Sequence, residues 1–172
     1  HLEGHLLSPF LSADAPEFPF VALLVSGGHT QLMWVEGLGR YRVLGETIDD
    51  AAGEAFDKFA KMAGLGYPGG VKVDQASQTG DKQKYNFPRS LASEDNLMMS
   101  FSGLKSSAHR LLEKMSPEEI EKEKSHLSAS FQEAIVDVLV TKLVKAAERF
   151  NCRKLVITGG VSANSRLRER IS

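Results

Sequence analysis

Val21-Ala-Leu-Leu-Val-Ser-Gly-Gly-His-Thr30 is an apolar run that ends in a glycine pair, and Leu155-Val-Ile-Thr-Gly-Gly-Val-Ser-Ala-Asn164 repeats this arrangement near the end of the chain. Short apolar runs bounded by turn residues are typical of buried strands. Two glycines behind a strand let the backbone turn sharply and expose several N–H groups, which can cradle a phosphate or another anion. The two turns therefore suggest a nucleotide held between them.

A single strand followed by two glycines is also common in ordinary tight turns, so neither copy alone identifies a ligand site. Ser26, Thr30, Ser162 and Asn164 flank the two turns. Their hydroxyl and amide groups are suited to hydrogen bonds with phosphate oxygens, ribose and base edges. The pair of turns indicates a nucleotide site more strongly than either turn does.

Composition bounds the class of protein. A chain of 172 residues with 42% apolar residues can bury one sizeable core, so we expect one domain with appendages. The formal net charge of −1 and an isoelectric point near 6.6 give no electrostatic footprint of a dedicated nucleic-acid binder. Any contact with nucleic acid is therefore expected to be local.

Residue usage also predicts the compartment. Cys152 is the single cysteine, so no intrachain disulfide can form and a reducing cytoplasm is the natural location. No apolar stretch reaches the roughly 20 residues that a membrane span requires, and no charged and then apolar leader precedes the first strand. These features predict a soluble, cytoplasmic protein with no membrane association.

The first part of the chain is expected to form three strands and a helix. The strands cover residues 20–26, 30–35 and 41–48, and their short glycine-bearing links favour an antiparallel meander. Asp49 or Asp50 is then expected to cap the helix. Its apolar stripe at helical spacing consists of Phe56, Phe59, Ala60 and Ala63.

The middle of the chain predicts an insertion over about residues 64–126. Residues 64–100 are rich in Gly, Pro, Ser, Lys and Asp with little periodicity, so we expect loops and short helices there. Ser116-Pro-Glu-Glu119 has the cap, the proline and the glutamate that open a helix. A longer helix is expected to follow, with a stripe of Leu127, Phe131, Ile135, Leu139 and Leu143.

A strand over 154–158 and a helix over 162–171 complete the predicted order, which is β-β-β-α, an insertion, and α-β-α. This order matches the ribonuclease-H-like lobe that actin-like ATPases and sugar kinases use twice. The predicted fold class is therefore α/β, a ribonuclease-H-like lobe of the actin-like ATPase (ASKHA) superfamily from a two-lobed parent. Fold analogy alone does not establish chemistry.

His1 and His5 are a candidate metal pair. Residues four positions apart share one face of a helix, so both imidazoles can reach a single ion at roughly 2.0–2.1 Å. The spacing resembles half of a metallopeptidase signature. That signature needs a glutamate directly after the first histidine, where Leu2 stands here, and the peptidase interpretation weakens accordingly.

Six motifs along the chain resemble one known family, in the family's order. They are His1-Leu-Glu-Gly-His5, Phe18-Pro-Phe-Val-Ala-Leu-Leu-Val-Ser-Gly-Gly-His-Thr-Gln31, Asp49-Asp-Ala-Ala-Gly-Glu-Ala-Phe-Asp-Lys58, Tyr67-Pro-Gly-Gly70, Phe101-Ser-Gly-Leu-Lys105 and Gly159-Gly-Val-Ser-Ala-Asn164. The chain looks like the bacterial TsaD branch of the tRNA N6-adenosine threonylcarbamoyltransferases, formerly described as O-sialoglycoprotein endopeptidases. The motifs span nearly the whole chain, which makes the resemblance highly specific.

The resemblance implies an acyl transfer onto tRNA. A threonylcarbamoyl group would pass from threonylcarbamoyl-AMP to the exocyclic amine of the adenosine 3′ of the anticodon, in tRNAs reading codons that begin with A. It also implies one divalent metal ion, iron (Fe2+) or zinc, and as partners the paralogous subunit TsaB and the small ATPase TsaE.

The resemblance further implies roles for single residues. His1 and His5 match metal ligands, and Leu24, Val25, Ser26, Gly27 and Gly28 match the loop that holds the phosphate and acyl group. Asp57, Gly70, Asp74 and Asn164 match further contacts to the adenylate. No general base follows from the residues: His29 is a candidate, but a phosphate contact or a role in the turn is at least as well supported.

The domain expectation follows from the same resemblance. Residues 1–17 would be the end of the first lobe with its metal motif, and residues 18–172 the C-terminal lobe, cut before its last strand. The family's third metal ligand, an aspartate, would lie beyond Ser172. We therefore expect this fragment to bind metal poorly and to be inactive by itself.

Two other functions remain open from the residues. A binding module would hold a nucleotide without turnover, and a metal-dependent glycoprotein endopeptidase would cleave peptides. Single residues also have plain structural interpretations: Asp57 as a surface carboxylate, Asn164 as a helix cap and Lys105 as a solvated charge.

Overall fold

The computed structural model describes residues 17–171. Four strands form one sheet in the order β3-β2-β1-β4: β1 (Phe20–Val25), β2 (Thr30–Gly37), β3 (Arg40–Glu46) and β4 (Leu155–Thr158). β1 pairs antiparallel with β2, β2 pairs antiparallel with β3, and β4 lies parallel to β1. The predicted meander is confirmed, and the mixed sheet with its helices confirms an α/β fold.

β1 is the centre of the fold because every one of its residues is buried. Its side chains alternate between two apolar clusters, as the period of a strand requires. Val21, Leu23 and Val25 join the large core under the helices. Phe20 and Leu24 join a second cluster that also contains Ala22, Met33 and Val35.

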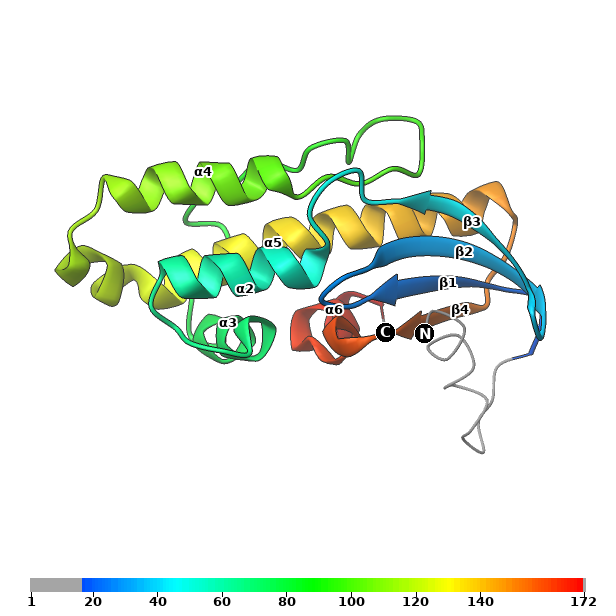
Figure 1. Cartoon of the computed structure of the whole chain (residues 1–172), viewed down its shortest axis with the longest axis horizontal. Helices are drawn as coiled ribbons and strands as arrows, with labels where there is room; N and C mark the ends of the chain where they lie inside the picture. Colours follow the sequence, from blue (N-terminus) through cyan, green and yellow to red (C-terminus); the bar gives the residue numbers. More distant parts are fainter. Residues whose placement is uncertain (1–16, 172) are drawn as a thin grey trace.

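Within residues 17–171, five α-helices accompany the sheet: α2 (Ala52–Met62), α3 (Gly69–Ser77), α4 (Ser102–Glu113), α5 (Pro117–Arg149) and α6 (Ser165–Ile171). Figure 1 shows α5 running along most of the molecule, with α2, α3 and α4 gathered at the end away from the sheet. Phe131 of α5 anchors this packing, because its ring centroid lies 4.2 Å from that of Phe59 and 6.3 Å from that of Phe56. The stripe predicted from helical spacing is therefore the core face of α2.

α5 is one continuous helix of 33 residues, where the sequence analysis expected a short helix followed by a longer one. The predicted cap is confirmed: Ser116 Oγ accepts from Glu119 N at 3.1 Å, and Ser116 N donates to Glu119 Oε1 at 3.2 Å. No glycine or proline lies between Glu119 and Leu127, so nothing in the backbone interrupts the helix.

The expected insertion contains two helices, α3 and α4, of which only α3 lies where short helices were predicted. α3 lies among the predicted loops and short helices, and residues 78–101 form turns and coil apart from an isolated bridge between Met99 and Thr47. α4, with 12 residues, was not predicted. It contains Ser102, Gly103, Ser106 and Ser107, which weaken the helical signal in the sequence.

The prediction that Asp49 or Asp50 caps α2 is wrong. Ala51 precedes α2, and the hydroxyl of Thr30 in β2 accepts from Ala52 N at 2.9 Å. Asp49 instead caps α4, because its Oδ1 accepts from the backbone N–H groups of Phe101 at 2.8 Å and Ser102 at 3.2 Å. Its Oδ2 accepts from the hydroxyls of Ser100 and Ser102. Asp49 was thus expected to cap the adjacent helix α2, but it caps the distant helix α4.

Asp49 gives the fold a pH dependence that can be measured. Burial raises the pKa of Asp49, but the hydrogen bonds from Ser100, Phe101 and Ser102 outweigh it and hold the pKa below its ordinary value of 3.8. The stabilisation from Asp49 is therefore complete above about pH 5 and is lost as the pH falls through 3.8 toward the lower pKa of the folded state. Asp49→Asn replaces a carboxylate with a neutral amide, which accepts these hydrogen bonds more weakly. We expect it to cost about 1 kcal/mol at pH 7 in urea unfolding and less at pH 3.

Asp95→Asn is the control for this prediction. The Asp95 side chain is 94% exposed and, among residues 17–171, pairs only with Arg149, so the substitution should change the free energy of unfolding little at either pH. An Asp49→Asn effect as large at pH 3 as at pH 7 would contradict the assignment.

None of the helices in residues 17–171 combines the length and the apolar character that crossing a membrane requires.

Candidate functional site

A cavity of about 550 Å³ opens beside the ends of β1 and β4, between the two glycine turns, α2 and α3. It brings together five of the residues that sequence reasoning singled out, from segments far apart in the chain. These residues are Gly27, Asp57, Gly70, Asp74 and Asn164. The rest of the lining is largely apolar and includes Phe56, Tyr67, Pro68, Val71, Val161 and Ala163. Such a combination of apolar walls with a few polar groups is typical of small-molecule sites.

The first glycine turn is closed by Ser26 and His29. Ser26 N donates to His29 O at 2.8 Å, and His29 N donates to Ser26 Oγ at 3.0 Å. Gly27 lines the cavity, and Gly28 is exposed in the same turn. Leu24 and Val25 lie fully buried in β1 and do not line it. Of the predicted stretch Leu24–Gly28, only Gly27 borders the cavity.

The second glycine turn packs directly against the end of β1. Gly159 has φ +99°, and a Cβ built there would lie 2.3 Å from the Val25 carbonyl oxygen. The turn then continues into a short 3-10 helix (Gly160–Ala163) whose Gly160 and Val161 border the cavity. The backbones at the ends of β1 and β4 are therefore in close contact, and both turns can face one ligand.

Asn164 is the N-cap of α6 as well as a wall of the cavity. Its Oδ1 accepts from Leu167 N at 3.0 Å, and its Nδ2 donates to Gln132 Oε1 at 2.8 Å. The side chain is held between α5 and α6 and is 7% exposed. The plain structural role of Asn164 is thus confirmed, alongside its position at the cavity.

The two predicted aspartates also support neighbouring elements. Asp57 Oδ1 accepts from Gly69 N at 2.9 Å and so caps α3. Asp74 accepts from Ser165 N at 2.9 Å and from the Ser165 hydroxyl at 2.6 Å, which fastens α3 to α6. Among the described residues, Asp57 Oδ2 accepts no hydrogen bond, so this oxygen is available to a ligand at the cavity.

Sequence reasoning missed two glycines that give the cavity its shape. A Cβ at Gly53 would lie 2.5 Å from Ser26 O, and a Cβ at Gly69 would lie 2.4 Å from the Cα of Asp57. Gly53 therefore lets α2 approach the first turn, and Gly69 lets α3 approach α2. By contrast, a Cβ at Gly70 meets no atom within 4 Å and would point into open space. The spacing of Gly53, Phe56 and Asp57 on one helical face was the available signal.

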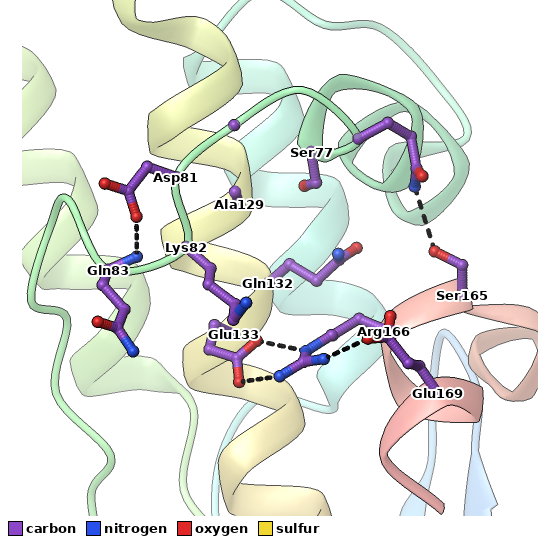
Figure 2. A pocket seen from close by; sticks show the side chains of 12 residues that line it. Ser77, Asp81, Lys82, Gln83, Ala129, Gln132, Glu133, Ser165, Arg166 and Glu169 are labelled. Atoms are coloured by element: carbon purple, nitrogen blue, oxygen red, sulfur yellow. Dashed lines mark hydrogen bonds and ion pairs between the residues drawn. The ribbon is translucent and has the colours of Figure 1, made fainter. Parts of the chain in front are cut away.

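A second cavity, of about 480 Å³, lies on the other side of the contact between α3 and α6. Figure 2 shows that its polar side chains are engaged with one another, since Arg166 bonds to Glu133 and Glu169. Gln78 Nε2 also donates to the Ser165 hydroxyl at 3.2 Å. None of the predicted site residues lines this cavity. The first cavity is therefore the candidate site.

The predicted metal ligands His1 and His5 lie outside the described residues, so the metal remains a prediction. Within residues 17–171, no group of three or more His, Cys, Asp or Glu side chains is placed to hold a metal ion. His29, the weak candidate for a base, lies in the first glycine turn and does not line the cavity.

A mixed sheet in an α/β fold, with two glycine turns at one cavity, fits the actin-like ATPase class of fold. The family model described as tRNA N6-adenosine threonylcarbamoyltransferase (TsaD) matches residues 1–172. The chain belongs to the TsaD family, as its motifs indicated.

Similar curated proteins carry the same description. A tRNA N6-adenosine threonylcarbamoyltransferase of Bdellovibrio bacteriovorus is 59% identical over 99% of this chain and 51% of its own length. Those of Paracidovorax citrulli and Herminiimonas arsenicoxydans are 57% and 52% identical, over 49% and 50% of their lengths. The chain thus spans about half the length of the curated relatives it matches.

Proposed function

We propose that this chain contributes the donor-binding lobe of a tRNA N6-adenosine threonylcarbamoyltransferase. The reaction transfers the threonylcarbamoyl group of threonylcarbamoyl-AMP to the exocyclic amine of the adenosine 3′ of the anticodon, in tRNAs reading codons that begin with A. Family membership supports the reaction class. The observation that carries the assignment of the site is the cavity shared by Gly27, Asp57, Gly70, Asp74 and Asn164.

The lining supports an adenylate as occupant. Backbone N–H groups at Gly27 and Gly160 are suited to a phosphate, because glycine turns bring such groups close to an anion without side-chain obstruction. Asp57 Oδ2 is suited to accept from a ribose hydroxyl. Phe56, Tyr67 and Val161 give apolar area for a base, and the Tyr67 side chain at the rim is 80% exposed.

The transfer step needs only the donor and the tRNA amine, because one bond forms as another breaks. The adenosine amine attacks the carbamoyl carbonyl carbon, a C–N bond forms, and the bond from that carbon to the phosphate oxygen breaks with its electron pair leaving on AMP. The amine proton is released to water. Water exclusion by the apolar lining would protect the donor from hydrolysis.

The finer organisation belongs to the same proposal. Residues 1–17 would end a first lobe, and residues 18–172 would form a ribonuclease-H-like second lobe. His1 and His5 supply donors that suit iron or zinc, and such an ion would polarise the carbonyl or steady the phosphate. TsaB and TsaE would be the protein partners, in the cytoplasm.

Gly70→Leu tests this proposal in a full-length protein that carries the chain. Gly70 opens into the cavity and has no atom within 4 Å of a Cβ, so a leucine should fill the cavity without disturbing packing. The protein is incubated with unmodified tRNA, threonine, bicarbonate, ATP, the adenylate-forming enzyme, TsaB and TsaE, and the digested nucleosides are weighed by mass spectrometry. We expect threonylcarbamoyladenosine from the parent and at least tenfold less from Gly70→Leu.

Lys72→Leu is the matched control, since Lys72 lies on the same helix but does not line the cavity. It should keep the activity of the parent. Unmodified adenosine in the parent reaction would overturn the transferase proposal. Nucleotide binding without turnover would then favour the binding module, and peptide cleavage would favour the endopeptidase.

A further inference from the structure

A basic groove of about 480 Å³ lies between α2 and α4, separate from both cavities described above. Its side chains come from the last turns of α2 and the middle of α4. The cationic and titratable residues that line it are Lys58, Lys61, Lys105, His109 and Arg110, and no acidic residue lines it. The whole chain carries a formal net charge of −1, so the groove lining is much more positive than the chain as a whole.

The cations of the groove differ in how far they are neutralised. Lys58 Nζ lies 2.8 Å from Glu54 Oε2, and Lys105 Nζ lies 2.9 Å from Asp50 Oδ2. His109 pairs with Glu113 at 3.4 Å. Lys61 and Arg110 are exposed and form no ion pair with any residue between 17 and 171. Two cations, one on each helix, are therefore available to an anion that lies along the groove.

The groove suits an extended polyanion rather than a small one. Its cations are on long exposed side chains from two helices, and it is open, without the converging backbone N–H groups that hold a single phosphate. Lysine and arginine side chains of this kind neutralise successive phosphates of a nucleic-acid backbone. Charge complementarity thus points to RNA.

The groove also lies next to the candidate site. Asp57 lines the first cavity and the adjacent Lys58 lines the groove, and neighbouring residues of a helix point about 100° apart, so the two sites lie on different faces of α2. Figure 1 shows α2 between α3 and α4. A helix with its side chains is about 10 Å across, a distance that one nucleic-acid backbone spans. An RNA whose base approaches the cavity can therefore place phosphates in the groove.

We propose that the groove between α2 and α4 binds the phosphate backbone of the tRNA substrate, an inference that rests on the proposed function for the identity of the RNA. Lys61 and Arg110 make phosphate contacts there. They position the RNA and read no sequence.

Charge reversal of the two unpaired cations tests this. The 172-residue chain is titrated against a fluorescently labelled, unmodified tRNA transcript between 50 and 200 mM KCl, and binding is followed by anisotropy. We expect Lys61→Glu/Arg110→Glu to bind tRNA about tenfold more weakly for each reversed cation at 0.1 M salt and to reduce the slope of log K against log[salt] by about two. Both residues are exposed and unpaired, so thermal unfolding should not change.

Arg40→Glu/Arg153→Glu is the matched control, because it makes the same change in net charge at the opposite end of the molecule, where β2 turns into β3 and the chain enters β4. It should leave tRNA binding within twofold of the parent. Equal weakening in both double variants, or no weakening in either, would overturn the proposal. Unchanged tRNA binding would overturn it even if the groove variant lost affinity for an acidic polypeptide such as polyglutamate.

A second readout separates this proposal from the proposed function. AMP binding to the first cavity, measured by calorimetry, should be the same in the groove variant and the parent. If AMP does not bind but the groove variant loses tRNA affinity, the result supports RNA binding by the groove and contradicts the proposed donor site. If threonylcarbamoyladenosine forms normally in a full-length protein that carries Lys61→Glu/Arg110→Glu, the result contradicts tRNA binding by the groove and supports the transferase proposal.

Discussion

Replacing Gly159 with alanine is expected to lower the free energy of unfolding by about 3 kcal/mol or more. Gly159 has φ +99°, where an L side chain is strained, and its Cβ would lie 2.3 Å from Val25 O and 2.7 Å from Val25 C. Both of those atoms belong to the backbone of the central strand, so neither can move aside cheaply. Urea unfolding of the chain measures the change.

Gly160→Ala is the matched control for this prediction. Gly160 is the next residue, has no positive φ, and meets no atom within 4 Å of a built Cβ. Its substitution should change the free energy of unfolding by less than about 1 kcal/mol. Equal effects at the two glycines would show that the second turn does not pack against β1 as described.

Glu133→Ala should destabilise the chain by about 1.5–3 kcal/mol, because it removes the shared charged partner of two arginines, each of which keeps one other carboxylate, Glu169 or Asp137. Glu133 of α5 is 7% exposed, and its carboxylate accepts from Arg166 at 2.7 Å and from Arg170 at 3.0 Å. Both arginines lie on α6, and Figure 2 shows Arg166 lying against Glu133. Removing the carboxylate leaves partly buried guanidinium groups without this partner and weakens the docking of α6.

Glu169→Ala is the control for Glu133→Ala. Glu169 also pairs with Arg166, at 2.9 Å, but its side chain is 71% exposed, so the destabilisation should stay within about 1 kcal/mol. Chemical unfolding of both variants gives the comparison. A Glu133→Ala effect no larger than that of Glu169→Ala would mean that the ion pairs to α5 do not hold α6 in place.

The local parts of the fold were predictable because local signals determine them. The meander follows from apolar runs separated by glycine-bearing links, and the start of α5 follows from the capping residues Ser116 and Glu119. Each of these interactions joins residues close in sequence. The predictions made from hydrophobic periodicity, turn residues and capping residues therefore agreed with the structure.

The unpredicted parts depend on contacts between distant residues. Asp49 resembles a local cap, but its hydrogen bonds go to residues 51 to 53 positions later, at the start of α4. Asp74 is fastened to Ser165, which lies 91 positions away. A single sequence without its fold does not show which of several competing donors an aspartate will bind.

The candidate site was predictable only where local motifs mark it, and not where it depends on contacts between distant residues. The glycine turns indicated that two strand ends meet at a ligand, and Gly27 and Asn164 do border one cavity. Gly53 shares a helical face with Phe56 and Asp57, but the importance of Gly53 and Gly69 lies in the close approach of α2 to the first turn and of α3 to α2. That approach exists only in the folded chain.

Mapping AMP on the chain by NMR tests the central claim most directly, the claim that the cavity between the glycine turns holds the adenylate. The isotope-labelled chain is titrated with AMP while the backbone amide signals are followed. We predict the largest shifts at Gly27, Gly70 and Val161, which line the first cavity. Shifts confined to Gly80, Asp81 and Lys82, which line the second cavity, or no saturable shifts at all, would contradict the account.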